Sequence, residues 1–393
     1  MKPLLFSVLP RPTHPTRDGL AIRNFHLLQA LARTFDVRAF VLRAPHLAGQ
    51  SEYPEGVEVE EFPQRPRRLR QAFSVAASAL AGGAYSPRLY RSRRLSARLA
   101  QETAAGRPAW IVAHSYHVAP LAFGRGRPAW IDFHNLDSQI WDRTAASASA
   151  LSVRAFARMQ APRVRAFERT LLARADGVSC VSAPDARELS RLASGVTPLV
   201  VPNGVDLDRY RFREESPGGG VLLFIGDLSW HPNADGLRWF ADRVWPLVQA
   251  LAPRARVEVV GRDAPADLPR RAPEWRFLGE GGDTPPHWAR ADAAVVPLRA
   301  AGGTRLKILE AAASGVPVVS TTVGAEGLAL ERETEILLRD DPPAFAAALV
   351  RLLEDAALRG RLAAAARARV EKQYDWRRIG DAFAEELLLR SRA

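Results

Sequence analysis

The stretch AGGTRLKILEAAASGVPVVSTT, residues 301–322, combines a glycine turn, a helical pattern and an apolar run typical of a buried strand. The pattern predicts a helix that begins near Thr304, a residue type that often occupies the N-cap. Arg305 and Lys307 then fall in the first turn. Each cation there is unfavourable by about 0.3–1 kcal/mol, because a helix N-terminus carries partial positive charge.

An anion bound at this helix start would remove the unfavourable electrostatics. Gly302 and Gly303 allow the backbone to approach a ligand closely. The free amides of the first turn would then meet a phosphate together with Arg305 and Lys307. The carboxylate of Glu310, one turn further on, can accept two hydrogen bonds from a ribose diol. An exposed Lys307–Glu310 pair is the alternative, but lysine before glutamate is the less favourable order. The stretch therefore predicts a nucleotide diphosphate site.

The rest of the chain alternates apolar runs with helical patterns, which is typical of parallel sheets with helices on both faces. The apolar runs of the first half are 3–9, 36–43, 57–62, 109–116, 129–135, 177–182 and 197–203. Those of the second half are 221–228, 256–261, 275–280, 293–298, 316–322 and 335–340. Helical patterns lie between them, for example at 21–34, 234–251 and 342–355. The alternation predicts an α/β protein with two doubly wound domains.

The charged and then Pro- and Gly-rich segment RFREESPGGG, residues 211–220, indicates a break between the halves. We expect a first domain over 1–206 and a second domain over 207–375. The segment 376–393 is an amphipathic helix that we expect to pack back on the first domain. Ligands of open α/β sheets bind outside the carboxyl ends of the strands, so the expected site is a cleft between the domains.

The composition indicates the cellular compartment of the protein. One cysteine, Cys180, in 393 residues excludes a disulfide framework and fits the cytosol. The apolar stretch near the N-terminus is too short for a secretory signal, and no apolar run approaches the ~20 residues of a membrane span. We therefore expect a soluble, cytoplasmic protein that could associate with a membrane surface.

The formal net charge is +12, which is compatible with nucleic acid, anionic lipid or an anionic substrate as partner. Only three of the 55 basic residues are lysine, so much of the charge reflects a compositional bias toward arginine. Between Phe62 and Arg98, however, there are nine arginines and no acidic residue. This stretch is either a solvated basic face or a contact with an anionic membrane or acceptor.

Several segments together resemble the retaining glycosyltransferases of family four, which have the GT-B fold, and in particular bacterial exopolysaccharide sugar transferases. The segments are PRPTHPTRDGLAIRNFHLLQALA (10–32), PNGVDLDRY (202–210), VLLFIGDLSWHPNADGLRWF (221–240), VGRDAP (260–265), WRFLGE (275–280) and GGTRLKILEAAASGVPVVST (302–321). The resemblance spans nearly the whole chain. It implies two Rossmann-like domains that face each other across a cleft, with the acceptor on the first and the nucleotide-sugar on the second.

The resemblance also implies roles for single residues. Glu310 would bind the donor ribose, and Arg305 and Lys307 would hold the donor phosphates. His134, in the strand-end segment WIDFHN, would lie beside the bond that is broken. These four residues form the expected catalytic set. The other expected donor-binding positions are Asp18, Gly19, Gly226, Asn233, Arg262, Gly302, Gly303 and Thr304. Arg17 lies in the same loop as Asp18.

Two positions depart from the family pattern. The family often has a first motif glutamate near the donor sugar, and here that position is Gly302. Many members also have an arginine and a lysine in the first loop of the second domain, whereas residues 226–236 contain neither. We expect Arg305 and Lys307 to supply that charge. The family uses no bound metal and no cofactor, since protein cations stabilise the leaving diphosphate.

The sequence thus favours a transferase that moves a sugar from a nucleotide diphosphate donor to a saccharide or lipid-linked acceptor, with no nucleic-acid partner. One alternative is a nucleotide-sugar epimerase on the same fold, although no convincing pair of acid and base carboxylates can be placed. A second alternative is a basic protein with a degenerate site that binds nucleic acid or an anionic membrane through residues 62–98. Steep salt dependence without any nucleotide-sugar dependence would favour that alternative.

Overall fold

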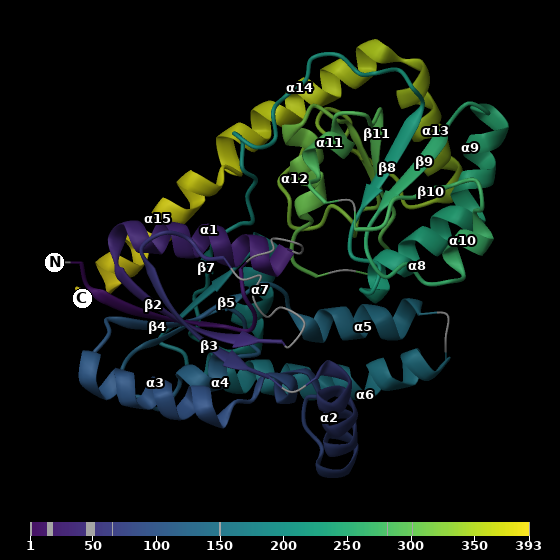
Figure 1. Cartoon of the computed structure of the whole chain (residues 1–393). Helices are drawn as coiled ribbons and strands as arrows, with labels where there is room; N and C mark the ends of the chain where they lie inside the picture. Colours follow the sequence, from purple (N-terminus) through teal and green to yellow (C-terminus); the bar gives the residue numbers. More distant parts are fainter. Residues whose placement is uncertain are drawn as a thin grey trace. The chain divides into compact units, whose positions relative to one another are not determined.

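A computed structural model of the chain describes residues 2–13, 19–44, 52–64, 66–148, 151–280, 282–300 and 302–392. It contains two compact units, each built around a parallel sheet (Figure 1). Unit 1 comprises Met1–Pro202 and Arg377–Ala393, and unit 2 comprises Asn203–Trp376.

The sheet of unit 1 has seven parallel strands in the order β3-β2-β1-β4-β5-β6-β7. Its strands are β1 (Leu4–Leu9), β2 (Asp36–Arg43), β3 (Val57–Pro63), β4 (Trp110–Ala113), β5 (Ala129–Phe133), β6 (Gly177–Cys180) and β7 (Leu199–Val200). Leu5 of β1 pairs with Val37 on one side and with Trp110 on the other. The central strands are buried on both faces, which explains why their sequences are continuous apolar runs.

Helices cover both faces of this sheet. They are α1 (Gly19–Thr34), α2 (Arg67–Ala81), η2 (Ser86–Tyr90), α3 (Arg93–Gly106), α4 (Ala119–Ala122), α5 (Asp137–Ser147), α6 (Leu151–Leu172), α7 (Ala183–Leu192) and α15 (Trp376–Arg390). Figure 1 shows α1 and α15 on one face and α3 and α4 on the other. Serine caps begin α3 and α7, where Ser92 and Ser182 accept hydrogen bonds from backbone amides of the first turn.

The C-terminal helix α15 packs within unit 1. Trp110 donates its indole N–H to the carbonyl oxygen of Leu387 at 2.9 Å, and the ring of Phe383 meets that of Trp130 edge-on at 5.9 Å. A Cβ at Gly380 would lie 2.6 Å from Cβ of Ala30, so glycine allows α15 to approach α1 closely.

The sheet of unit 2 has six parallel strands in the order β10-β9-β8-β11-β12-β13. Its strands are β8 (Val221–Ile225), β9 (Arg256–Val260), β10 (Arg276–Phe277), β11 (Ala293–Val296), β12 (Val318–Ser320) and β13 (Leu337–Leu338). Side chains of a strand alternate between the faces. Leu222 and Phe224 therefore enter one hydrophobic core, and Leu223 and Ile225 enter the other.

Helices again cover both faces in unit 2. They are α8 (His231–Trp239), η3 (Phe240–Val244), α9 (Trp245–Leu251), α10 (Leu268–Arg271), α11 (Pro285–Trp288), α12 (Leu306–Ala313), α13 (Pro342–Glu354) and α14 (Ala356–Gln373). Phe240, Trp245 and Phe345 belong to the core with Phe224, while Ile308 and Leu309 belong to the core with Ile225. The doubly wound α/β fold and each predicted strand are confirmed.

The predicted end of the first domain at residue 206 is four residues late. The amide side chain of Asn203 donates to the hydroxyl of Thr304 at 2.8 Å. The backbone amide of Val205 donates to the carbonyl of Tyr374 at 2.7 Å, and Val205 forms a parallel bridge with Asp375. These bonds join residues 203–206 to unit 2, although the Pro- and Gly-rich segment follows them.

A buried carboxylate completes the start of α5. Leu136 at its N-cap has no side chain that could accept a hydrogen bond from the first turn. Glu168 of α6 fills this role, because its Oε1 accepts from the backbone amide of Ser138 at 3.2 Å. Glu168 is fully buried, and this burial raises its pKa from 4.5 to about 7.

Replacing Glu168 with glutamine should change the pH dependence of stability. Between pH 4.5 and about 7 the folded protein binds more protons at Glu168 than the unfolded chain does. The contribution of Glu168 to the free energy of unfolding therefore falls as the pH rises. The Glu168→Gln variant keeps the acceptor oxygen without the titration. We expect its free energy of unfolding to exceed that of the wild type by on the order of 1–3 kcal/mol at about pH 8, and by much less at about pH 5. Denaturant unfolding of both proteins measures this; an equal difference at both pH values would contradict it.

Candidate active site

The carboxyl ends of β8, β9 and β11 lie at one edge of the sheet in unit 2, because these strands are parallel. Gly226 follows β8, and its amide donates to the carbonyl of Val260 at 2.9 Å. A Cβ at Gly261, which follows β9, would lie 2.0 Å from the carbonyl oxygen of Gly226. Glycine at 261 is therefore required for the two backbones to approach each other so closely.

Lys307 of α12 reaches the same place. Its Nζ donates to Oδ1 of Asn233 at 3.0 Å and lies 4.0 Å from the centre of the Phe224 ring. A Cβ at Gly226 would be 2.7 Å from Lys307 Nζ and 2.8 Å from Asn233 Nδ2. The structure thus brings together three predicted donor-binding residues, and the lysine lies against the loop that itself has no cation. Burial and the nearby Arg305 lower the pKa of Lys307 from 10.5 to about 7.

The predicted N-cap of this helix, Thr304, is wrong by one residue. Helix α12 begins at Leu306, and Arg305 occupies the N-cap with an extended backbone at φ −95° and ψ 102°. The hydroxyl of Thr304 accepts the bond from Asn203 and does not cap the helix. The buried guanidinium of Arg305 contacts the carbonyl of Gly303 and lies 3.4 Å from that of Glu326. Lys307 is consequently the cation in the first turn of α12.

Glu310 lies on the next turn of α12 and is buried. Its Oε2 accepts a hydrogen bond from the indole N–H of Trp288 at 3.3 Å. Burial raises the pKa of Glu310, while hydrogen bonds from Trp288 and Tyr210 oppose that change. The hydroxyl of Tyr210 also lies 2.7 Å from that of Thr284. The carboxylate is therefore oriented by two aromatic side chains, neither of which was a predicted site residue.

Arg262, after β9, is paired with a carboxylate of the first loop. Its guanidinium contacts Oδ2 of Asp227 at 2.6 and 3.1 Å, and its carbonyl accepts from the amide of Leu228 at 3.1 Å. The ion pair lies next to Gly226 and reduces the charge that Arg262 can offer to a phosphate. Asp227 was not a predicted site residue, although it is the one charged residue of 226–230, between β8 and α8, and this was a usable signal.

Two of the predicted residues, His134 and Gly19, lie in the described part of unit 1. His134 follows β5, and its Nε2 lies 3.1 Å from Oδ2 of Asp132. Gly19 is the first residue of α1. Arg17 and Asp18 lie outside the described residues. Burial lowers the pKa of His134, and the carboxylate of Asp132 opposes that change.

Asp132 is held in turn by a buried ion pair. Both carboxylate oxygens accept from the guanidinium of Arg23 at 2.8 Å, and Oδ1 also accepts from the hydroxyl of Ser179 at 2.7 Å. Asp132 and Arg23 are fully buried. Burial opposes ionisation of Asp132, but Arg23 outweighs it and holds the pKa of Asp132 well below its usual range. A carboxylate inside the apolar run AWIDF was the signal in the sequence, because a buried charge needs a partner.

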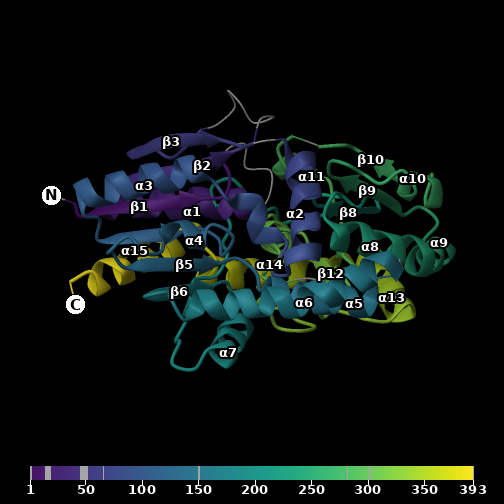
Figure 2. The same cartoon turned by 90° about the horizontal axis from the view of Figure 1, so that it is seen from below.

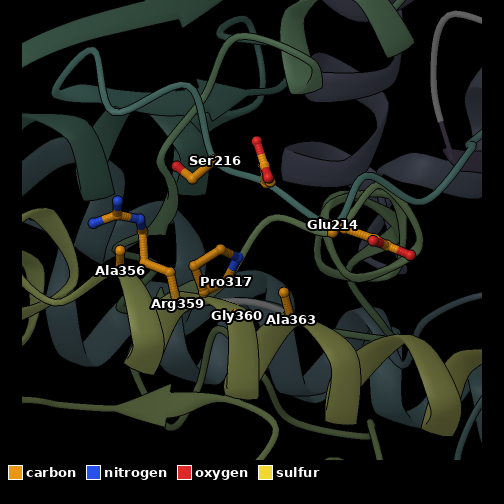
Figure 3. Close-up of a pocket in the computed structure, with 9 residues that line it drawn as sticks. Glu214, Ser216, Pro317, Ala356, Arg359, Gly360 and Ala363 are labelled. Atoms are coloured by element: carbon orange, nitrogen blue, oxygen red, sulfur yellow. The ribbon is translucent and has the colours of Figure 1, made fainter.

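A cavity of ≈ 290 Å³ lies elsewhere in unit 2 (Figure 3). Its lining residues are Glu214, Glu215, Ser216, Gly315, Pro317, Ala356, Arg359, Gly360 and Ala363. Ser216 precedes β8 and Pro317 precedes β12, so the cavity lies at the amino ends of the strands. The predicted donor-binding residues Gly226 and Arg262 follow β8 and β9 at the opposite edge, where ligands of open parallel sheets bind.

Two features bear on metal ions and membranes. In the described part of the chain, no group of three or more His, Cys, Asp or Glu side chains is placed to hold a metal ion. Within the same residues, no helix is both long enough and apolar enough to traverse a bilayer.

Two family models match the chain in succession. Residues 17–209 match the model described as "Glycosyltransferase Family 4", and residues 219–355 match "Glycosyl transferases group 1". Together they cover most of both units. The chain belongs to the GT-B glycosyltransferases.

Characterised relatives of this glycosyltransferase agree with that assignment. The glycogen synthase of Mycobacterium tuberculosis is 28% identical over 95% of this chain and 92% of its own length. The D-inositol 3-phosphate glycosyltransferase of Geodermatophilus obscurus is 32% identical over 56% of this chain and 54% of its own. These relatives support sugar transfer by the present enzyme.

Solved structures of the same fold also match the glycosyltransferase. Sucrose-phosphate synthase of Thermosynechococcus elongatus has a TM-score of 0.77 at 18% identity and full coverage of both chains. The Anabaena protein HepE, in complex with UDP and glucose, has a TM-score of 0.67 at 18% identity, with 98% of this chain and 99% of that chain covered. At these identities the likeness establishes the fold.

Removing one partner of the buried ion pair between Arg23 and Asp132 should destabilise the protein far more than removing both. Asp132→Leu leaves the guanidinium buried without its carboxylate, and we expect a loss of about 3–5 kcal/mol in the free energy of unfolding. The double variant Arg23→Met/Asp132→Leu removes both charges and should recover most of that loss. Denaturant unfolding at neutral pH compares the three proteins. If the double variant were as unstable as the single one, packing at these positions would be the cause.

Proposed function

We propose that this glycosyltransferase moves a sugar from a nucleotide diphosphate donor to a saccharide or lipid-linked acceptor, with retention at the anomeric carbon. The observation that carries the proposal is the position of Lys307 beside Gly226 and Asn233, at the carboxyl edge of the sheet in unit 2. This partly buried cation has one neutral hydrogen-bond acceptor and an aromatic ring, and the carboxylate of Glu310 offsets only part of the effect of burial, so the charge is poorly compensated. A diphosphate would supply the missing negative charge.

The leaving diphosphate would be stabilised by groups of the protein. As the bond from the anomeric carbon to the phosphate oxygen breaks, the electron pair stays on that oxygen and negative charge grows there. Lys307 and the free amides at the start of α12 would face this charge, and the N-cap residue Arg305 lies next to them. This arrangement supports a reaction that needs neither a metal ion nor a cofactor.

Glu310 would bind the ribose of the donor. One carboxylate oxygen is already held by Trp288, so the side chain has a fixed direction before a ligand arrives. A charged acceptor of this kind suits the two hydroxyls of a ribose. Gly302 occupies the position of the first motif glutamate, so contacts to the sugar would come from other residues. His134, oriented by Asp132, is the candidate in unit 1.

The relatives support the proposed donor and acceptor classes. Structures of HepE contain UDP and UDP-glucose, so UDP-sugars are the first donors to test. Phosphatidyl-myo-inositol mannosyltransferase of Mycobacterium tuberculosis is 31% identical over 49% of this chain and 54% of its own length. Together with the nine arginines between Phe62 and Arg98, this supports a cytoplasmic enzyme that meets an acceptor at an anionic membrane.

A thermal-denaturation screen with UDP, GDP and ADP tests the donor proposal. A ligand at a hundredfold excess over its Kd adds about 2.7 kcal/mol to apparent stability, so the true nucleotide should raise the melting temperature clearly. The matching nucleotide-sugar should then release nucleoside diphosphate only when a saccharide or lipid-linked acceptor is added. No shift with any of the three nucleotides would overturn the proposal. A rearranged sugar formed without acceptor would identify an epimerase.

Lys307 should take up a proton when the diphosphate binds. The anion favours the charged lysine, and near pH 8 most Lys307 side chains of the free protein are neutral. Calorimetry in two buffers of different ionisation enthalpy should therefore show uptake of about one proton per nucleotide bound. Lys307→Met should abolish this uptake and weaken affinity about 10- to 100-fold.

Two control variants accompany Lys307→Met. Lys372→Met removes an exposed lysine of α14 in the same unit, and His134→Ala removes the candidate sugar-side group in unit 1. Both should keep the nucleotide affinity and the proton uptake, while His134→Ala should reduce turnover. Unchanged uptake in Lys307→Met would show that this lysine does not meet the diphosphate.

A further inference from the structure

Helix α2 of unit 1 has its polar and apolar faces reversed. The side chains of Ser74 and Ser78 are buried, at 2% and 0% exposure. Leu69, Phe73 and Leu80 are instead 64%, 76% and 90% exposed. The last three positions are spaced by four and seven residues, so they form one stripe along the helix. An apolar stripe normally faces a protein core, and here it faces outward.

Hydrogen bonds fix this orientation. The amide of Gln160 in α6 donates to the hydroxyl of Ser78 at 3.0 Å, and the guanidinium of Arg163 donates to the carbonyl of Ser78 at 2.7 Å. The same serine hydroxyl donates to the carbonyl of Gly83 at 2.8 Å. Figure 1 shows α2 crossing α6 and extending away from the sheet of unit 1. Turning the stripe inward would break these bonds.

Arginines belong to the same stretch of chain as the stripe. Arg70 of α2 donates to the carbonyl of Leu89 at 2.5 Å, which joins the helix to the η2 turn. The chain then continues into Arg91, Arg93 and Arg94, whose side chains are exposed. No acidic residue occurs between Phe62 and Arg98, so this stretch of the sequence itself contributes positive charge alone. Figure 2 shows α2 and α3 of unit 1 from below.

We propose that α2 is an interfacial helix that inserts Leu69, Phe73 and Leu80 into the surface of an anionic lipid bilayer. Helices that lie in a membrane interface combine an exposed apolar stripe with basic residues, and the only charged residues of 62–98 are arginines. Anionic headgroups complement the arginines, whereas a second copy of this surface would bring like charges together. The inference rests on the membrane contact in the proposed function and does not depend on the donor chemistry.

Vesicle co-sedimentation of the full chain tests this inference. The wild type should bind vesicles of equal parts phosphatidylglycerol and phosphatidylcholine, bind pure phosphatidylcholine much less, and release as salt rises. The variant L69S/F73S/L80S should lose binding by at least about tenfold, because its apolar stripe is gone. Replacing Arg91, Arg93 and Arg94 with glutamine should remove the preference for the anionic lipid.

Leu251→Ser is the matched control, since Leu251 is 61% exposed on α9 of unit 2. It should bind vesicles as the wild type does. Nucleotide affinity should be unchanged in all of these variants, so loss of vesicle binding with intact nucleotide binding would separate this inference from the donor site. Equal vesicle binding by L69S/F73S/L80S and wild type, or none by the wild type, would overturn the proposal. A further contradicting result would be a wild type that self-associates in light scattering without binding vesicles, and a triple variant that no longer self-associates.

Discussion

Parallel strand pairing is the constraint on which the rest of this structure depends. Strands that all run one way deliver their carboxyl ends to a single edge of the sheet, and the chain must return along a helix on one of the faces. In unit 2 this places the turns after β8 and β9 next to each other, and α12 begins beside them. Glycine at 226 and 261 then allows an approach that any side chain would prevent. The candidate donor site is a consequence of that geometry.

The two units contain cations that are shielded from water and compensated in opposite ways. Arg23 has a carboxylate partner, Asp132, with two hydrogen bonds, so its charge is compensated within the protein. Lys307 has a neutral amide oxygen and the ring of Phe224, and its pKa falls to about 7. The first arrangement stabilises and orients, because nothing further is needed to satisfy it. The second leaves negative charge to be supplied by a ligand, and for that reason we regard Lys307 as the centre of donor binding.

The residues of the proposed site are divided between the units. Groups suited to a nucleotide diphosphate, namely Lys307, Glu310 and the start of α12, all belong to unit 2. Unit 1 contributes His134 with its carboxylate support and the outward apolar stripe of α2. Such a division suits an enzyme whose donor is a soluble nucleotide-sugar and whose acceptor lies at a surface.

Much of the fold could be predicted from the sequence because it depends on local patterns. Apolar runs of strand length and the helical patterns between them indicate the parallel sheets, since a strand buried on both faces must be apolar throughout. The resemblance of GGTRLKILE to a family motif likewise pointed to Lys307 and Glu310 before any contact was known. Their roles stay predictions, and so does the role of His134. A short motif of this kind can be recognised in the sequence, because residues a few positions apart in the chain also lie close together in space.

The tertiary structure alone decided the contacts between distant residues. Arg23 and Asp132 are 109 residues apart, and the signal in the sequence was only a carboxylate in an apolar strand. Asn203 binds Thr304 across 101 residues, which moves the domain boundary and leaves Arg305 at the N-cap of α12. Lys307 meets Asn233 across 74 residues. Propensity and periodicity act over a few turns of chain, whereas pairing, burial and the pKa of Lys307 depend on which segments the sheet brings together.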